Sequence, residues 1–318
     1  MAQVVVVGSL SMDLTVQTAA LPSPGETVIG EAFTMVPGGK GNNQAVTCAR
    51  QGVTTAFVGR IGSDAFGDAV RAQLVVEGVE DSHLSADPEI PTGIAHITVD
   101  STGQNFIIIV PQANYAMTTA HVGEAASVIE GASVLLVQLE IHLDVVREAL
   151  RTARRGGTIT ILNPAPALDL DDELLGLVDI CIPNEVEAAA LTHMEVDGAD
   201  GAIAAAKNLI GRGCRAVVVT LGAKGAVYVD RERMLEVAAL SVPVVDTVAA
   251  GDAFCGAFAS VLALGSKLET CLARATAAGA LAVGVRGATP SLPRSQAVDD
   301  LIAKLGPIEV TSIATPPG

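Results

Sequence analysis

Residues 134–164 read VLLVQLEIHLDVVREALRTARRGGTITILNP. The two ends, VLLVQLE (134–140) and TITILNP (158–164), are short apolar runs typical of buried strands. The segment between them, LDVVREALRTARRGG, reads as a helix. A strand, a helix and a second strand in this order predict a parallel βαβ unit, in which the helix covers one face of a sheet.

The same alternation extends in both directions along the chain. VVVVGSL (4–10) predicts a first buried strand, and GNNQAVTCARQG (41–52) predicts a helix. Further strands are predicted at VDICIPN (178–184) and AVVVTLG (216–222), with the helix DGAIAAAKNLIGRG between them. We therefore expect an α/β fold built on a doubly wound, mostly parallel sheet with helices on both faces.

Two segments interrupt this alternation. Residues 14–36 have no helical period, and residues 92–110 read as two strands around the turn DSTG. Together the two segments supply four strands without helices, which predicts a small β-sheet lid over a site in the core. The alternative is that they extend the main sheet. The expected domains are an α/β core of residues 1–13, 37–91 and 111–318, and a lid of residues 14–36 and 92–110.

The composition narrows the class of protein. Of the 318 residues 50% are apolar, but only 3% are aromatic and none is Trp, so the core must consist of Val, Ala, Leu and Ile. A net charge of −16 argues against binding to nucleic acid or to an anionic membrane, because both need clustered Lys and Arg. It does not exclude a phosphate ligand, which requires only local donors and a metal ion.

The cysteines and the first residues indicate the compartment. The five cysteines form no CxxC pair and lie in apolar stretches, which predicts buried free thiols in a reducing compartment. The opening MAQVVVVGSL has no basic region and is too short for a signal sequence or a membrane span. We expect a cytoplasmic protein.

The stretch PGGKGNNQA (37–45) is a glycine-rich turn that opens a helix. Its glycines let the backbone approach a ligand closely, and Lys40 and Asn43 project polar groups at the helix start. It is not a Walker A loop, because GK is not followed by Ser or Thr, and no GxGxxG follows the first strand. A flexible turn without a ligand is the alternative interpretation.

The stretch DTVAAGD (246–252) opens another helix. The backbone N–H groups of Ala249, Ala250 and Gly251 at a helix N-terminus would bind an anion, and their small side chains leave those donors open. Asp252 would then lie beside a bound phosphoryl group and accept a proton from an attacking hydroxyl. The alternative is that Asp252 only caps the helix.

Together these motifs resemble the signatures of the ribokinase family, the PfkB carbohydrate kinases. The matching segments follow the family's order over nearly the whole chain: GSLSMD (8–13), PSPGET (22–27), GGKGNNQA (38–45), VQLE (137–140), NPAPA (163–167), PNEVEAAALT (183–192), TLGAKG (220–225), DTVAAGDAF (246–254) and GATPSLP (287–293). The NPAPA and AAGD variants are most similar to the ribose-phosphorylating members.

The resemblance implies ATP-dependent phosphorylation of D-ribose at the 5-hydroxyl, which gives ribose 5-phosphate and ADP. It implies that Asp252 is the catalytic base and that Ala249, Ala250 and Gly251 form the anion hole. The partners that it implies are a small-molecule sugar and MgATP, with no nucleic acid and no membrane. It also implies a homodimer that pairs through the lid.

By the same resemblance, polar groups at strand ends and at a helix start bind the sugar: Ser11, Asp13, Gly39, Lys40, Asn43, Glu140 and Asp252. The positions implied for ATP are Asn184, Thr220, Gly222 and Thr276. Glu187 would act on Mg²⁺ mostly through water, which suits an ion that dehydrates reluctantly. A monovalent cation, K⁺, is implied beside Asp246, Val248, Ala282, Val285, Gly287 and Ser291, mostly through backbone carbonyls.

One position departs from the family. Ser11 stands where ribokinases carry Asn, and its side chain is shorter and lacks the second polar group of an amide. The exact sugar is therefore open, and the alternatives are another pentose, deoxyribose or a nucleoside. A non-catalytic sugar-binding regulator is the alternative from another class, since a fold alone does not fix function.

Overall fold

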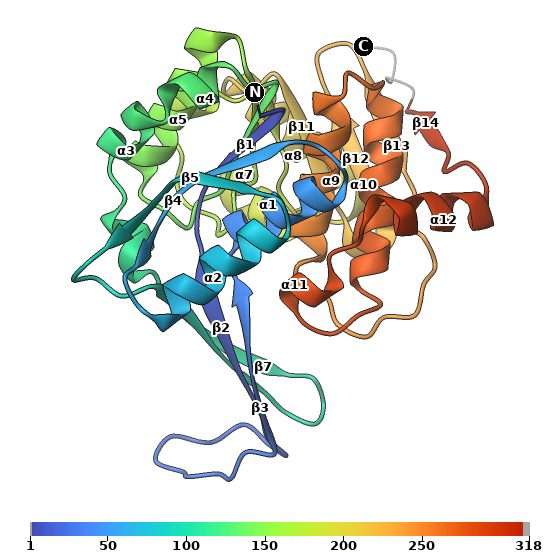
Figure 1. Cartoon of the computed structure of the whole chain (residues 1–318). Coiled ribbons are helices and arrows are strands. Elements are labelled where there is room, and N and C mark those ends of the chain that lie inside the picture. The colour runs from blue at the N-terminus through green and yellow to red at the C-terminus, as the bar shows by residue number, and fades with distance from the viewer. Residues whose placement is uncertain (1, 314–318) are drawn as a thin grey trace.

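The computed structural model describes residues 2–313 (Figure 1). Its main sheet has ten strands, which are β1 (Val4–Val7), β4 (Thr55–Gly62), β5 (Glu80–Asp87), β8 (Val134–Val137), β9 (Ile159–Leu162), β10 (Ile180–Cys181), β11 (Ala216–Thr220), β12 (Ala226–Val229), β13 (Met234–Val237) and β14 (Val310–Ser312). Their order across the sheet is β14-β13-β12-β11-β10-β9-β8-β1-β4-β5. The strands from β5 to β11 are parallel, and β12, β13 and β14 pair antiparallel at one edge.

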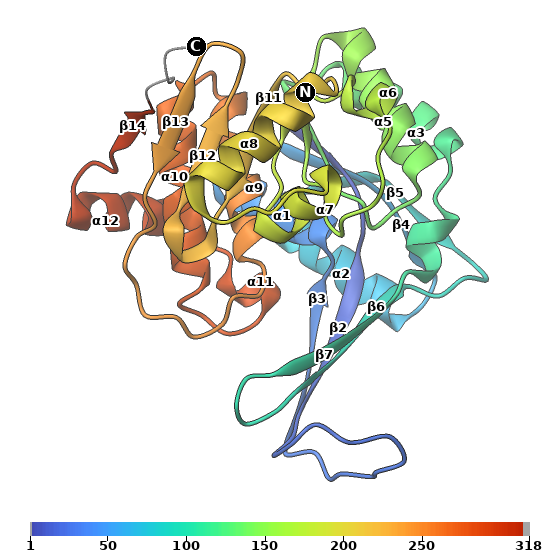
Figure 2. The same ribbon diagram turned by 180° about the vertical axis from the view of Figure 1, so that it is seen from behind.

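Helices cover both faces of this sheet, as Figures 1 and 2 show from opposite sides. One face carries α1 (Lys40–Arg50), α2 (Ala65–Val76), α9 (Ala250–Ala263), α10 (Leu268–Ala282) and α12 (Ser295–Leu305). The other carries α3 (Thr119–Glu124), α4 (Ala126–Glu130), α5 (Leu143–Gly156), α6 (Asp172–Leu175), α7 (Glu185–Thr192) and α8 (Gly198–Gly211). Short turns of helix are η1 (Gln112–Ala116), η2 (Gly222–Lys224) and α11 (Ala288–Ser291).

The first strand shows why the sheet is buried on both sides. All four valines of β1 are fully buried; Val4 and Val6 belong to one apolar core, and Val5 and Val7 belong to the other. Successive side chains of a strand point to opposite faces, so a continuous apolar run suits a strand between two helical layers. The expected α/β fold with a doubly wound, mostly parallel sheet is confirmed.

A second sheet of four strands projects from the core (Figures 1 and 2). Its strands are β2 (Ser11–Gln17), β3 (Ala32–Gly38), β6 (Gly93–Val99) and β7 (Asn105–Val110), in the order β3-β2-β6-β7. The two inserted segments therefore do not extend the main sheet. β2 begins at Ser11 and β3 ends at Gly38, so these strands run from the projecting sheet directly into the edge of the core.

The strand expected over residues 178–184 is shorter in the structure, where β10 covers only Ile180–Cys181. Pro183 has no N–H to continue the ladder, and Asn184 already caps α7. Within residues 2–313, no helix combines the length and apolar character needed to cross a bilayer.

Candidate active site

A pocket of about 310 Å³ lies between the second sheet and the main sheet. Its lining includes many of the residues that the sequence suggested for sugar binding and catalysis: Ser11, Asp13, Gly39, Lys40, Asn43, Glu140, Ala249 and Asp252. Val248, suggested for the monovalent cation, also lines it. Ala95, Ile97, Ile107 and Ile109 of the second sheet form an apolar wall. The structure therefore brings polar groups from distant parts of the sequence into one place.

These residues reach the pocket from elements that meet at one edge of the sheet. Asp13 lies near the start of β2, the strand that follows β1, and Glu140 lies just after β8, the parallel neighbour of β1. Lys40 and Asn43 occupy the start of α1, and Asp252 lies in the first turn of α9. β1 lies between β4 and β8: the chain adds β4 and β5 on one side of β1 and then returns to add β8 on the other side. Open α/β sheets bind ligands where the strand order reverses in this way.

Two amide groups hold the carboxylate of Asp252. The Asn43 Nδ2 donates to Oδ2 at 2.9 Å, and the Gln44 Nε2 donates to Oδ1 at 2.9 Å. Asp252 is only 7% exposed, and this burial raises the pKa of its carboxyl group, although Lys40 and the two amides favour the charged form. A raised pKa makes the carboxylate a better proton acceptor.

The half-buried Lys40 side chain lies among acidic groups. Burial alone disfavours its charge, but the carboxylates of Asp252, Glu140 and Glu187 outweigh this and raise the pKa of Lys40 above its ordinary value. Lys40 is therefore a cation at neutral pH. Its position between these groups offers positive charge to an anionic ligand that enters the pocket.

Asp13 and Glu140 form the polar floor of the pocket. Glu140 accepts a hydrogen bond from the Ser9 hydroxyl at 2.5 Å and another from the Lys40 backbone N–H at 3.1 Å. Asp13 accepts one from Ser11 at 3.0 Å. Burial raises the pKa of Asp13 to about 6, and the nearby Glu140 and Asp252 add to the rise while Ser11 opposes it.

The start of α9 has an unusual backbone. Ala249 is the residue before the helix and has φ 60°, in the left-handed region that non-glycine residues rarely adopt. No side chain caps the helix, so Asp252 does not serve as its cap. A side chain on Gly251 would meet nothing within 4 Å. Space is therefore open beside the first turn, and the N–H groups of Ala249 and Gly251 make no hydrogen bond within residues 2–313.

One of the three suggested anion donors is already used. The N–H of Ala250 donates to the carbonyl of Thr247 at 3.3 Å, because residues 247–250 form a turn before the helix begins. The expectation that all three N–H groups stand free is corrected at this position.

The residues suggested for ATP and Mg²⁺ do not line this pocket. Asn184, Glu187, Thr220 and Gly222 follow the ends of β10 and β11, whereas Thr276 lies on α10. Asn184 and Glu187 form a reciprocal cap on α7, with bonds of 2.8 and 2.9 Å between side chain and backbone, and Asn184 pairs with Thr220 at the end of β11. Gly222 opens η2 with φ 53°. Thr276 is buried in α10, and its hydroxyl has no hydrogen-bond partner within residues 2–313.

Comparison with known proteins decides the family, since the pfkB family of carbohydrate kinases matches residues 1–295. The chain belongs to this family. It is 40% identical over 302 residues to ribokinase of Mus musculus, covering 92% of each chain. It is 33% identical over 301 residues to deoxyribokinase of Salmonella typhimurium, covering 94% of this chain and 98% of that one.

The solved structure of Arabidopsis thaliana ribokinase complexed with ribose and ATP is similar over the whole fold. Its TM-score is 0.89 at 34% identity, covering 95% of this chain and 98% of the other. As a PfkB-family carbohydrate kinase, the protein is an enzyme that transfers a phosphoryl group to an alcohol of a sugar.

Two loops of the kinase meet beside the start of α9, and they contain the residues suggested for a monovalent cation. The Asp246 carboxylate accepts from the N–H of Val248 at 3.0 Å and from that of Gly287 at 2.9 Å. The carbonyl of Val283 accepts from the N–H groups of residues 245 and 246. The carboxylate therefore ties the loop before α9 to the loop after α10. The Ala282 carbonyl accepts from the N–H of Val285 at 3.2 Å, and Ser291 donates to Ala288.

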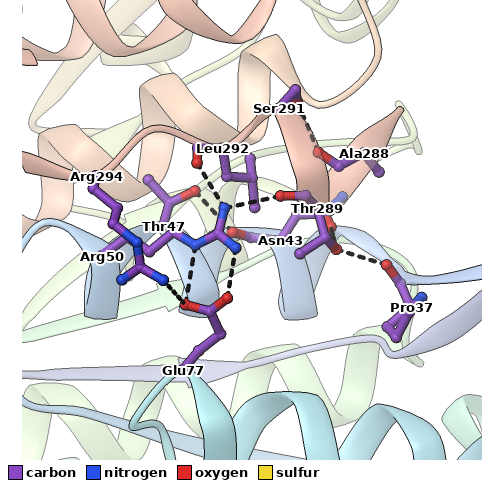
Figure 3. A network of polar contacts seen from close by, with 10 residues as sticks. All are labelled: Pro37, Asn43, Thr47, Arg50, Glu77, Ala288, Thr289, Ser291, Leu292 and Arg294. Carbon is purple, nitrogen blue, oxygen red and sulfur yellow. Dashed lines mark hydrogen bonds and ion pairs between the residues drawn. The ribbon is translucent and has the colours of Figure 1, made fainter. Parts of the chain in front are cut away.

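A further network holds α11 against the core (Figure 3). Arg50, at the end of α1, donates to the carbonyls of Thr289 at 2.9 Å and Leu292 at 2.6 Å, and it pairs with Glu77. The Thr289 hydroxyl donates to the carbonyl of Pro37 at 2.6 Å. The loop after α10 is thus fastened to α1 and to the end of β3, where the second sheet joins the core.

Several polar residues of the site were not singled out from the sequence. Ser9 holds Glu140, and Asn114 holds both the N–H and the carbonyl of Leu10 at 2.9 and 2.7 Å. Gln44 donates directly to Asp252, and Asn163 accepts a hydrogen bond from the same amide of Gln44. A usable signal exists for Ser9, Gln44 and Asn163, because all three lie inside the family motifs GSLSMD, GGKGNNQA and NPAPA.

Proposed function

We propose that the protein phosphorylates D-ribose at its 5-hydroxyl with ATP, giving ribose 5-phosphate and ADP. The observation that carries this proposal is the meeting of three features in one pocket. These are the buried carboxylate of Asp252, the open N-terminus of α9 and the polar groups of Asp13, Lys40 and Glu140. The relatives named ribokinase, at 40% identity in the mouse protein, support ribose as the sugar.

Asp252 would accept the proton of the sugar hydroxyl as that oxygen attacks the γ-phosphate. Its burial and raised pKa favour this role. The free N–H groups at the start of α9 would stabilise the charge that develops on the transferred group, together with the cation of Lys40. Alignment and charge stabilisation are most of what phosphoryl transfer requires.

The sugar would lie between the polar floor and the apolar wall of the second sheet. Asp13, Asn43 and Glu140 offer groups that bind hydroxyls, and the second sheet acts as a lid. A volume of about 310 Å³ is at the small end of the range for ligand sites, roughly 300 to 1,000 Å³. This size suits a monosaccharide.

The residues present fit Mg²⁺ held mainly through water and phosphate. Glu187 has one oxygen bonded to the N–H of Asn184, and its other oxygen makes no hydrogen bond within residues 2–313. No group of three or more His, Cys, Asp or Glu in that range could form a protein cage for a metal. When bound, Mg²⁺ would neutralise charge on the phosphates, and we place it beside Glu187 with ATP along Asn184, Thr220, Gly222 and Thr276.

A monovalent cation fits the two loops joined by Asp246. A bound K⁺ would use carbonyls of these loops and stiffen the segment that leads into α9, so we expect higher turnover in K⁺ than in Na⁺. Steady-state assays at fixed ionic strength measure this, and a flat response to every monovalent ion would remove the proposal.

We further propose a cytoplasmic protein, in keeping with its five buried free cysteines.

Deoxyribose is the second candidate substrate. Ser11 replaces the usual Asn, and its hydroxyl is committed to Asp13 at 3.0 Å rather than free for a sugar hydroxyl. The deoxyribokinase relative at 33% identity shows that this sugar occurs among similar proteins. Because Ser11 offers one hydrogen-bonding group fewer than Asn, the site should discriminate less strongly between sugars that differ by one hydroxyl.

The deciding experiment measures ADP release with MgATP over a panel of pentoses, deoxyribose, hexoses and nucleosides. Ribose is expected to give the highest kcat/KM, and NMR of the product should place the phosphate on the 5-oxygen. A higher kcat/KM for deoxyribose or a nucleoside would replace ribose by that substrate. Release of ADP that is independent of every sugar would overturn the proposal.

A further inference from the structure

A chain of buried amide side chains leads to the carboxylate of Asp252. The Gln138 Nε2 donates to the Gln44 Oε1 at 2.5 Å. The Gln44 Nε2 donates both to Asp252 Oδ1 at 2.9 Å and to Asn163 Oδ1 at 3.0 Å. Gln44 and Gln138 are fully buried and Asn163 is 8% exposed, so no bulk water competes for these groups.

The chain is anchored to the rigid edge of the main sheet. Gln138 follows β8 directly, and Asn163 follows β9 and donates to the carbonyl of Ile182 at 2.9 Å. Gln138 also fills the space beside Gly8, where an added Cβ would lie 2.0 Å from its Oε1. The Gln44 side chain on α1 is therefore fixed by residues at the ends of β8 and β9, which are part of the rigid main sheet.

These contacts permit only one orientation of the Gln44 amide. Its NH₂ group has two hydrogens, and both point at acceptors, while its carbonyl faces a donor. The reversed amide would place its carbonyl against the oxygens of Asp252 and Asn163 and its NH₂ group against that of Gln138. Gln44 therefore always presents an N–H to Asp252.

With Asn43 on the other oxygen, both oxygens of Asp252 receive one N–H each. This fixes the plane of the carboxylate and leaves a second lone pair on each oxygen. Asn43 lines the pocket but Gln44 does not, so Gln44 acts on Asp252 without touching a ligand there.

We propose that Gln44, oriented by Gln138 and Asn163, is a positioning residue that fixes the carboxylate of Asp252 for proton transfer. The proposal rests on the assignment of Asp252 as the base. It gives the two amides that bond to Asp252 different roles. Asn43 lines the pocket and can contact a ligand, whereas Gln44 lies behind Asp252 and only positions its carboxylate.

The test is Gln44→Met, which keeps the length of the side chain and removes its polar groups. We expect kcat to fall about tenfold to a hundredfold, as for a small misplacement of a reacting group, while the KM for the sugar changes by less than about threefold. The acid limb of the pH profile of kcat should move to higher pH, because Gln44 lowers the pKa of Asp252. Sugar affinity measured by calorimetry without ATP should be nearly unchanged.

Gln138→Glu tests the same idea without changing a neighbour of Asp252. A carboxylate at 138 cannot donate to the Gln44 carbonyl and repels it, so the Gln44 side chain should lose its anchor and move away from Asp252, with the same fall in kcat and the same shift of the acid limb. If Gln44→Met does not fold, this variant decides the question. The matched control is Gln51→Met, directly after the same helix, where a buried amide donates to the carbonyl of Pro293 at 2.9 Å; its kcat and acid limb should be normal.

A lower melting temperature with an unmoved acid limb and unchanged kcat in both Gln44→Met and Gln138→Glu would mean that the amide chain is only structural, and would overturn the proposal. Failure of the proposed reaction is distinguishable, because the unmodified protein would then release no sugar-dependent ADP.

Discussion

Asp252 is the residue on which the chemistry depends, and its carboxylate can be removed with little change in shape. We expect Asp252→Asn to lower kcat by roughly 10² to 10⁴, the usual effect of losing a general base. Binding of ATP should persist, because none of the residues suggested for the nucleotide lines the pocket that holds Asp252. Steady-state kinetics and calorimetry measure the two effects.

A matched control for this change is Asp230→Asn, at a carboxylate of the β12–β13 turn that bonds to Tyr228 and Arg233. It should keep normal turnover. Near-normal turnover in Asp252→Asn itself would show that another group takes the proton.

Asp13 predicts how stability depends on pH. Its folded-state pKa is about 6 against an ordinary value of 3.8, so the folded protein holds this proton more tightly than the unfolded chain. Its contribution to the free energy of unfolding is therefore greatest below pH 3.8 and is lost as the pH rises through about 6. Between pH 4 and pH 8 the loss is up to about 3 kcal/mol. Urea unfolding of the protein and of Asp13→Asn over this range measures it.

The variant should lose this part of the pH dependence and be relatively more stable at pH 8. An equal slope in both proteins would mean that Asp13 titrates normally in the folded state.

Ser11 is the residue at which selection among sugars can be examined. Ser11→Asn restores the family's usual amide, and it should change discrimination between ribose and deoxyribose by about 0.5 to 1.5 kcal/mol, the net worth of one hydrogen bond. The KM for ATP should stay nearly constant, because Ser11 lines the sugar pocket. Assays over the sugar panel give both quantities. Unchanged kinetics on every sugar would place Ser11 outside contact with the substrate.

At the scale of elements, the start of α9 combines a left-handed residue with a glycine in open space. Gly251→Val should fold normally, because a Cβ there meets nothing within 4 Å. It should still reduce kcat/KM by at least about tenfold, since a branched side chain would occupy the space in front of the N–H groups that stabilise the transferred phosphoryl. Circular dichroism and kinetics separate folding from activity.

Gly123→Val is the matched control, because Gly123 is also helical and also faces open space, but it lies on α3 away from the pocket. Full activity in Gly251→Val would place the anion site elsewhere.

The alternation of parallel strands and helices could be predicted from the sequence, because apolar runs separated by helical segments are typical of a parallel sheet. The antiparallel edge formed by β12, β13 and β14 was not predicted. The meeting of Lys40, Glu140 and Asp252 came from resemblance to a family, since nothing in their local patterns relates residues so far apart. The amide of Gln44 was missed because a polar residue on a helix usually faces solvent. Its burial is evident only once β8, β9 and α1 are placed together.

At the scale of the whole molecule, the second sheet has two different faces. The strand register places Asp13, Ala95 and Ile109 on one face with Ile97 and Ile107, and these residues line the pocket. The neighbouring positions lie on the opposite face, where four large apolar side chains are more than half exposed: Phe33, Met35, Phe106 and Ile108. An apolar patch of this kind on a projecting sheet indicates an interaction surface.

We propose that this outer face pairs two copies of the chain through their lids. A charge placed there should separate the dimer, because an unpaired carboxylate is costly in an apolar interface. Phe106→Glu and Ile108→Glu are therefore expected to sediment at half the mass of the unmodified protein in analytical ultracentrifugation. Their secondary structure should be unchanged, since both side chains are exposed in the single chain.

Ile107→Glu is the control, because Ile107 lies between these two residues on the same strand but faces the pocket. It should remain dimeric while its KM for the sugar rises, since a carboxylate would replace part of the apolar wall. This opposite pair of outcomes from adjacent residues distinguishes an interface from general damage to the strand. If Ile107→Glu dissociates the dimer as readily as Phe106→Glu, the subunits do not pair through the outer face alone. If the unmodified protein sediments as a monomer at the concentrations of the assay, the lid closes the site without a partner, and the exposed apolar face has another role.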